Sequence, residues 1–104
     1  MSRVLVVDDE AVNREMLGEI LSQDYNIIYA ESGKAALAKI QSLRERISLI
    51  VLDLLMPELD GYSVLENLRK DSELSKIPVI VLTSEKSAEV KSLQMGAADF
   101  LTKP

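Results

Sequence analysis

Short apolar runs at regular intervals are the feature of this 104-residue sequence that most constrains its fold. They lie at 4–7, 26–30, 49–52 and 79–82, with a weaker run at 100–101. Three of them are continuous rather than alternating, which is the pattern of strands buried on both faces of a parallel sheet. The runs therefore predict a sheet of parallel strands.

Amphipathic segments separate these runs, and in four of them apolar residues recur at helical spacing. The four sets are Val12, Met16, Leu17, Ile20 and Leu21; Ala36, Leu37, Ile40 and Leu43; Val64, Leu65 and Leu68; and the weaker Ala88, Leu93 and Met95. Ser32 is a candidate N-cap of the second helix, Ser63 or Asp60 of the third, and Gly96 suits the end of the fourth. Strands that alternate with helices form βαβ units with right-handed crossovers. The sequence therefore predicts an open, doubly wound parallel α/β sheet.

Composition excludes several kinds of chemistry. The chain has no cysteine and no histidine, so it cannot form a Ser-His or Cys-His nucleophile pair or an ordinary zinc or copper site. Its net charge of -5 does not favour binding to the phosphates of nucleic acid. No apolar run approaches the roughly 20 residues of a membrane helix, and the N-terminus does not resemble a signal peptide. The expected compartment is the cytoplasm, with no contact to a membrane.

Polar side chains follow the strands at the edge where such sheets bind ligands. In chain order they are Asp8-Asp9-Glu10, Glu31-Ser32, Asp53, Thr83-Ser84 and Lys103. If the first and third strands are neighbours, about 4.8 Å apart, then Asp8, Asp9 and Asp53 converge. Carboxylates crowded in this way repel one another unless a cation joins them, and a divalent ion with oxygen ligands such as Mg²⁺ fits.

Each of these residues also has a simpler explanation when it is taken alone. Asp9 could cap the first helix, Asp60-Gly61 could form a turn, Thr83 could be another cap, Lys103 a solvated terminus and Phe100 a core residue. Their joint placement favours a functional site, because almost every strand end carries a group that phosphoryl transfer requires.

Four motifs give the chain a resemblance to a known family. They are VLVVDDE at 4–10, LDLLMPELDG at 52–61, VLTS at 81–84 and DFLTKP at 99–104. With them the whole chain resembles the receiver domains of two-component response regulators. The resemblance implies a flavodoxin-like strand order of 2-1-3-4-5 and one domain over residues 1–104. The family's last helix would follow Pro104, so the resemblance also implies a receiver domain truncated after its fifth strand.

The resemblance also implies a role for each residue at the strand ends. Asp53 matches the phosphoacceptor, and Asp8 and Asp9 match the acidic pair that holds Mg²⁺, with Asp9 favoured as the direct ligand. The remaining matches are the backbone carbonyl of Leu55 for the metal, and Thr83, Ser84, Lys103 and Phe100 for phosphate contact and switching. The implied phosphoryl donor is a histidine kinase or histidine phosphotransfer protein, and the chain would be a signalling module rather than a turnover enzyme.

Two other functions stay open at this point. A magnesium-dependent aspartyl-phosphate phosphatase on a similar fold would need an acid at the position of Leu55, which argues against that class. A receiver-fold interaction module no longer regulated by phosphorylation is the second alternative. The missing helix also gives an expectation: one alternate set of residues from 79–82, with Phe100 or Leu101, is left open. The chain then either self-associates through that face or is markedly unstable.

Overall fold

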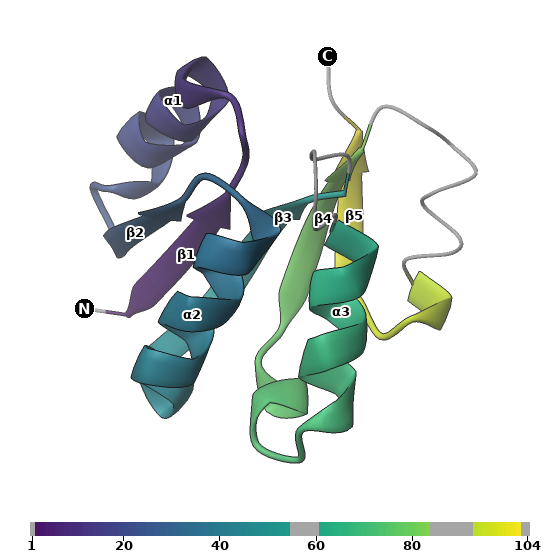
Figure 1. The fold of residues 1–104 in the computed structure, drawn as a ribbon. Coiled ribbons are helices and arrows are strands. Elements are labelled where there is room, and N and C mark those ends of the chain that lie inside the picture. Colours follow the sequence, from purple (N-terminus) through teal and green to yellow (C-terminus); the bar gives the residue numbers. More distant parts are fainter. Residues whose placement is uncertain (1, 55–60, 84–92, 103–104) are drawn as a thin grey trace.

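The computed structural model describes residues 2–54, 61–83 and 93–102 (Figure 1). The strands are β1 (Arg3–Val7), β2 (Asn26–Ala30), β3 (Ile47–Asp53), β4 (Val79–Thr83) and β5 (Asp99–Thr102). The helices are α1 (Ala11–Leu21), α2 (Gly33–Leu43) and α3 (Gly61–Lys70), with short 3-10 helices η1 (Arg44–Arg46) and η2 (Leu74–Lys76). Each predicted apolar run thus lies within a strand.

All strand pairs are parallel, and the strands lie in the order β2-β1-β3-β4-β5. The prediction of a doubly wound α/β sheet is confirmed, with the order 2-1-3-4 across its first four strands. We call the edge where the strands end the carboxyl edge and the edge where they begin the amino edge.

Helices cover both faces of the sheet, α2 and α3 on one and α1 on the other (Figure 1). Alternate residues of each strand point to opposite faces. On β1, Leu5 and Val7 belong to the larger apolar core together with α2 and α3, while Val4 and Val6 belong to a smaller core on the α1 side. Both faces of the central strands are therefore buried, which explains their continuous apolar sequences.

The apolar stripe predicted for α1 is divided in the structure. Leu17 and Leu21 pack on the smaller core. Val12, Met16 and Ile20 are exposed instead, with 72%, 48% and 65% of their surface accessible. Since successive helical residues differ by about 100°, the positions 12, 16 and 20 form a second stripe that faces away from the sheet.

The helix ends agree in part with the sequence. The Ser32 hydroxyl accepts a hydrogen bond from the Ala35 N–H at 3.0 Å, so the predicted cap of α2 is confirmed. Ser63 lies inside α3 and is not its cap, which makes that alternative wrong, and Asp60 lies outside the described residues. Gly96 has φ of +105°, a conformation that glycine adopts at low cost. Most of the predicted fourth helix lies outside the described residues.

The expected open face on β4 is only partly seen. Val79 and Val81 are buried in the larger core. Leu82, on the opposite side, is also buried because Val4, Val6 and Val51 pack in the same cluster, and Ile80 is half-buried. The expectation is therefore wrong for Leu82, and self-association stays a prediction. No helix in the described part of the chain is long and apolar enough to cross a membrane.

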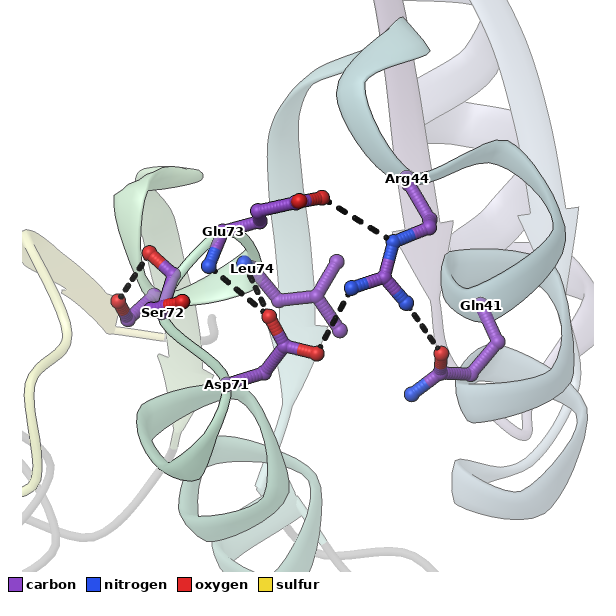
Figure 2. Close-up of polar contacts among 7 residues, drawn as sticks. Gln41, Arg44, Asp71, Ser72, Glu73 and Leu74 are labelled. Carbon is purple, nitrogen blue, oxygen red and sulfur yellow. Dashed lines mark hydrogen bonds and ion pairs between the residues drawn. The ribbon is translucent and has the colours of Figure 1, made fainter.

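A cluster of paired charges lies at the amino edge, between the last turns of α2 and α3 (Figure 2). The Arg44 guanidinium donates to Asp71 Oδ2 at 2.8 Å, to Glu73 Oε2 at 3.3 Å and to Gln41 Oε1 at 2.7 Å. Asp71 Oδ1 accepts from the backbone N–H groups of Glu73 and Leu74 at the start of η2. The cluster thus ties α2 to the segment that connects α3 with β4.

Hydrogen bonds in this cluster shift two pKa values. The N–H group of Leu74, together with Arg44, holds the pKa of Asp71 below its ordinary value. The carboxylates of Asp71 and Glu73 raise the pKa of Arg44. Both shifts favour the charged forms, so the pair stays ionised around neutral pH.

Candidate functional site

Two buried aspartates lie at the carboxyl edge, where two neighbouring strands end. Asp53 is the last residue of β3, and Asp8 follows the last residue of β1. The two strands pair directly, with Val7 opposite Leu52, so each carboxylate stands one position beyond that pair. Asp8 has 0% and Asp53 1% of its surface exposed. The predicted convergence of the first and third strands is therefore present in the backbone.

The turn after β1 gathers three acids. Carboxylate oxygens of Asp8, Asp9 and Glu10 lie within 4.8 Å of one another. The backbone N–H of Glu10 donates to Asp8 Oδ1 at 2.9 Å, which fixes the buried carboxylate against the turn. The Asp8 N–H donates to Ala30 O at 3.1 Å, which joins the turn to β2. Among the described residues, Asp53 is not a member of this set of mutually close acids.

The sequence left open whether Asp9 is merely a helix cap. In the structure the N-cap of α1 is Glu10, and its side chain makes no capping hydrogen bond. Asp9 stands one position before the cap and is exposed. The capping explanation of Asp9 is therefore wrong, and its carboxylate is available to a ligand at this edge.

Sequence reasoning did not assign a role to Glu10 or to Arg14. Glu10 could have been included, because it continues the acidic run that contains Asp8 and Asp9. Arg14 donates through Nη1 to the backbone oxygen of Asp8 at 2.7 Å. No sequence motif predicts the contact between Arg14 and Asp8, because it depends on the conformation of the Arg14 side chain.

Gly61 holds the start of α3 close to Asp53. Its N–H donates to Leu54 O at 3.0 Å. A Cβ at this position would lie 2.5 Å from Asp53 O and 2.6 Å from Leu54 Cα, closer than any side chain can approach backbone. The glycine that the sequence places in a turn with Asp60 is thus the first residue of a helix, and it permits contact between α3 and the end of β3.

The remaining predicted residues are only partly described. Thr83 is the last residue of β4 and pairs with Thr102, and Phe100 pairs with Val81, which places their backbones in the sheet. Leu55, Ser84 and Lys103 lie outside the described residues. Their roles, and those of the Thr83 and Phe100 side chains, stay predictions.

The donor chemistry of this edge suits a hard divalent cation. The candidate ligands among the described residues are carboxylate oxygens, which Mg²⁺ and Ca²⁺ prefer, and the chain has no histidine or cysteine to attract a softer metal. Buried carboxylates beside other acids are destabilised by mutual repulsion, so a cation here would relieve an existing cost. Asp8, Asp9 and Glu10 are the residues that could hold it, with Asp53 on the adjacent strand.

Comparison with known proteins decides the family. The model of the response regulator receiver domain matches residues 4–104. The chain belongs to this family. Receiver domains are signalling modules of two-component systems that interact with histidine kinases or phosphotransfer proteins, so this receiver domain is a signalling module on a flavodoxin-like fold.

Three similar proteins show the range of contexts for this receiver domain. A probable transcriptional regulator, ycf27 of Porphyridium aerugineum, is 44% identical over 98% of the chain, which spans only 42% of that relative. The two-component response regulator ORR3 of Oryza sativa subsp. indica is 38% identical over 97% of the chain and 79% of its own length. The manganese-bound form of response regulator Rcp1 matches all of the chain and 82% of its own, with 31% identity and a TM-score of 0.89.

Proposed function

We propose that this receiver domain is a phosphoacceptor, and that Asp53 receives a phosphoryl group in a reaction that depends on Mg²⁺. The observation that carries the proposal is the position of Asp53. It is a carboxylate 1% exposed at the end of a buried strand, and the neighbouring strand ends in Asp8. A carboxylate is disfavoured at such a place unless it has a specific role.

In the proposed reaction a carboxylate oxygen of Asp53 attacks the phosphorus of a phosphohistidine. The new P–O bond forms as the P–N bond breaks, and the bonding electrons leave with the imidazole nitrogen. Because the chain has no histidine, the donor is a histidine kinase, a histidine phosphotransfer protein or a small acyl phosphate. Rigid placement of the nucleophile supplies much of the catalysis in transfers of this kind.

Asp8, Asp9 and Glu10 would hold the divalent ion, together with Asp53 and the carbonyl of Leu55. The ion, when bound, neutralises negative charge that develops on the transferred group. Rcp1, a response regulator of similar fold, has been solved in a manganese-bound form, which supports the binding of a divalent cation. Lys103 would pair with a phosphoryl oxygen after transfer.

The proposed output is a change in packing around β5 and the predicted fourth helix, most of which lies outside the described residues. Thr83 and Ser84 would hydrogen-bond the new phosphoryl oxygens, and Phe100 would turn toward the space that Thr83 leaves. The backbones of Thr83 and Phe100 lie on the paired strands β4 and β5, which supports the coupling. Such a change biases an equilibrium between two conformations and so alters the binding of an output domain or partner.

Intact-mass measurement after incubation with acetyl phosphate tests this function. The parent chain is expected to gain one phosphoryl group with Mg²⁺ and none with a chelator. Asp53→Asn is expected to gain none, while Asp24→Asn, a control at an exposed aspartate, behaves as the parent. An Asp53→Asn chain that gained the same mass would disprove the assignment. A parent that accepted no phosphoryl group, from acetyl phosphate or from a phosphohistidine donor, would favour the unphosphorylated interaction module.

A further inference from the structure

Arg14 is a cation at an unexpected place. It lies in the fourth position of α1, near the positive end of the helix dipole, where acidic rather than basic residues are stabilising. The first turn of α1 itself contains no acidic residue to offset it, and the nearest acids, Asp8, Asp9 and Glu10, precede the helix. A positive charge at this end of the helix therefore calls for a local explanation.

The explanation lies in two hydrogen bonds that Arg14 donates to the turn formed by Asp8, Asp9 and Glu10. The Arg14 backbone N–H donates to Glu10 O at 3.1 Å, the first bond of the helix. Its side chain returns toward the N-terminus, as long helical side chains do, and Nη1 donates to Asp8 O at 2.7 Å. Both ends of the acidic turn are thus tied to one residue.

The tie matters because the turn carries the acidic cluster. Asp8 O belongs to the same residue whose carboxylate accepts from the Glu10 N–H. Fixing Asp8 O and Glu10 O together fixes the peptide units between them, and Asp9 is the residue in the middle. Arg14 thus holds the backbone that carries three carboxylates, all within 4.8 Å of one another.

We infer that Arg14 is a positioning residue that sets the Mg²⁺ affinity of the Asp8-Asp9-Glu10 turn, an inference that rests on the proposed function. Arg14 acts through the backbone oxygen of Asp8 and does not coordinate the ion. Residues that orient metal ligands in this way typically change metal affinity by about 10- to 100-fold when they are replaced.

The inference predicts that removing a positive charge, that of Arg14, weakens the binding of Mg²⁺. A positive charge near a cation site opposes cation binding, so electrostatics alone predicts that loss of Arg14 strengthens Mg²⁺ binding. Positioning predicts the reverse. Arg14 also lines a surface hollow with Glu31 and Lys39, where solvent and salt screen its charge, so positioning is expected to dominate.

Calorimetric titration with MgCl₂ at fixed pH and ionic strength tests the inference on the intact chain. Arg14→Ala is expected to weaken Mg²⁺ binding by about tenfold, and Arg14→Lys to recover most of the loss because its ammonium group can donate to the same oxygen. Lys34→Ala is the matched control. Lys34 is exposed in the first turn of α2, at the same edge of the sheet. Removing its charge should leave the affinity within about twofold of the parent or slightly tighter.

The results of these titrations separate the possibilities. Arg14→Ala that binds Mg²⁺ as tightly as the parent, or more tightly, overturns the inference, as does Lys34→Ala with an equal loss. If Arg14→Ala does not fold, Arg14→Gln is expected to show the same weakening, because its shorter neutral side chain does not reach Asp8 O, and parent-like affinity overturns the inference. A parent that accepts a phosphoryl group on Asp53 while Arg14→Ala keeps full affinity disproves only the role of Arg14. A parent that binds no Mg²⁺ disproves the proposed function as well.

Discussion

The two edges of the sheet differ in the partners of their acidic side chains. At the carboxyl edge Asp8 and Asp53 are buried on neighbouring strands, and Asp9 and Glu10 add two more acids. At the amino edge every acid of the cluster has a cation: Arg44 contacts both Asp71 and Glu73 (Figure 2). Crowded acids make a site that gains by binding a cation, whereas paired charges make a connection that needs no ligand. The acids of one edge could bind a cation, whereas the charges of the other hold two parts of the fold together.

The edges also differ in the surroundings of a glycine that each contains. At the carboxyl edge Gly61 touches the backbone of Asp53 and Leu54, where no side chain fits. At the amino edge, a Cβ on Gly96 would meet none of the described residues within 4 Å, and the glycine has only an unusual φ. A close backbone contact at the end of a buried strand tolerates less change than a turn at the surface.

The largest expected effect separates these two glycines. Gly61→Ala is expected to lower the free energy of unfolding by about 3 kcal/mol or more, because its Cβ would collide with two backbone atoms that cannot move without shifting Asp53. Gly96→Ala should lose only about 1–2 kcal/mol, the cost of a left-handed conformation. Urea unfolding of both variants measures the difference. Equal losses would mean that the end of β3 adapts to α3.

A second effect concerns the acids of the carboxyl edge. Asp8→Asn and Asp53→Asn should each raise the free energy of unfolding without metal, by about 1–3 kcal/mol, because one crowded charge is removed. Both should reduce the stabilisation that Mg²⁺ gives the parent, since a ligand stabilises the state to which it binds. Thermal unfolding with and without Mg²⁺ measures both effects. Unchanged stability in both conditions would show that these acids do not interact.

The smallest effect is a pH dependence at the amino edge. The pKa of Asp71 is lower in the folded chain than its ordinary value, so folding favours the charged form. The stabilisation is complete above the ordinary value of 3.8 and is lost as the pH falls through the lower folded value. Asp71→Asn should therefore be less stable than the parent near neutral pH, by a small amount since the pair is partly exposed.

Unfolding of the parent and Asp71→Asn between neutral and strongly acidic pH tests this third prediction. The difference in stability between them should shrink below the ordinary value of the Asp71 pKa. Glu66→Gln is a suitable control, because Glu66 pairs with Lys70 on the exposed surface of α3 alone and connects no other element. A constant difference across the whole range would contradict the pKa shift of Asp71.

Local sequence was sufficient to predict much of the fold and part of the site. Continuous apolar runs predicted the strands, because a strand that is covered on both faces carries apolar side chains on both. The place of Asp53 followed from the end of such a run, and the Ser32 cap from its chemistry. These features depend on residues close together in the chain.

Other features depend on contacts that local sequence does not contain. Five apolar residues on α1 fit two stripes, and only packing decided that Leu17 and Leu21 face the core. Arg44 and Asp71 are 27 positions apart, and their pairing requires the ends of α2 and α3 to meet. The reach of Arg14 to Asp8 depends on a side-chain conformation. The sequence therefore predicted which residues lie at the carboxyl edge better than it predicted what holds them there.

The contacts at the two ends of α3 also fix its length. One end is held where Gly61 meets the end of β3, and the other where Asp71, just after the helix, meets Arg44. One inserted residue would lengthen the helix by about 1.5 Å and rotate everything after it by about 100°, so only one end could keep its partner. Insertions and deletions among natural relatives of this chain should therefore be rare in α3. They should be more frequent in segments that contact the rest of the fold at one end only.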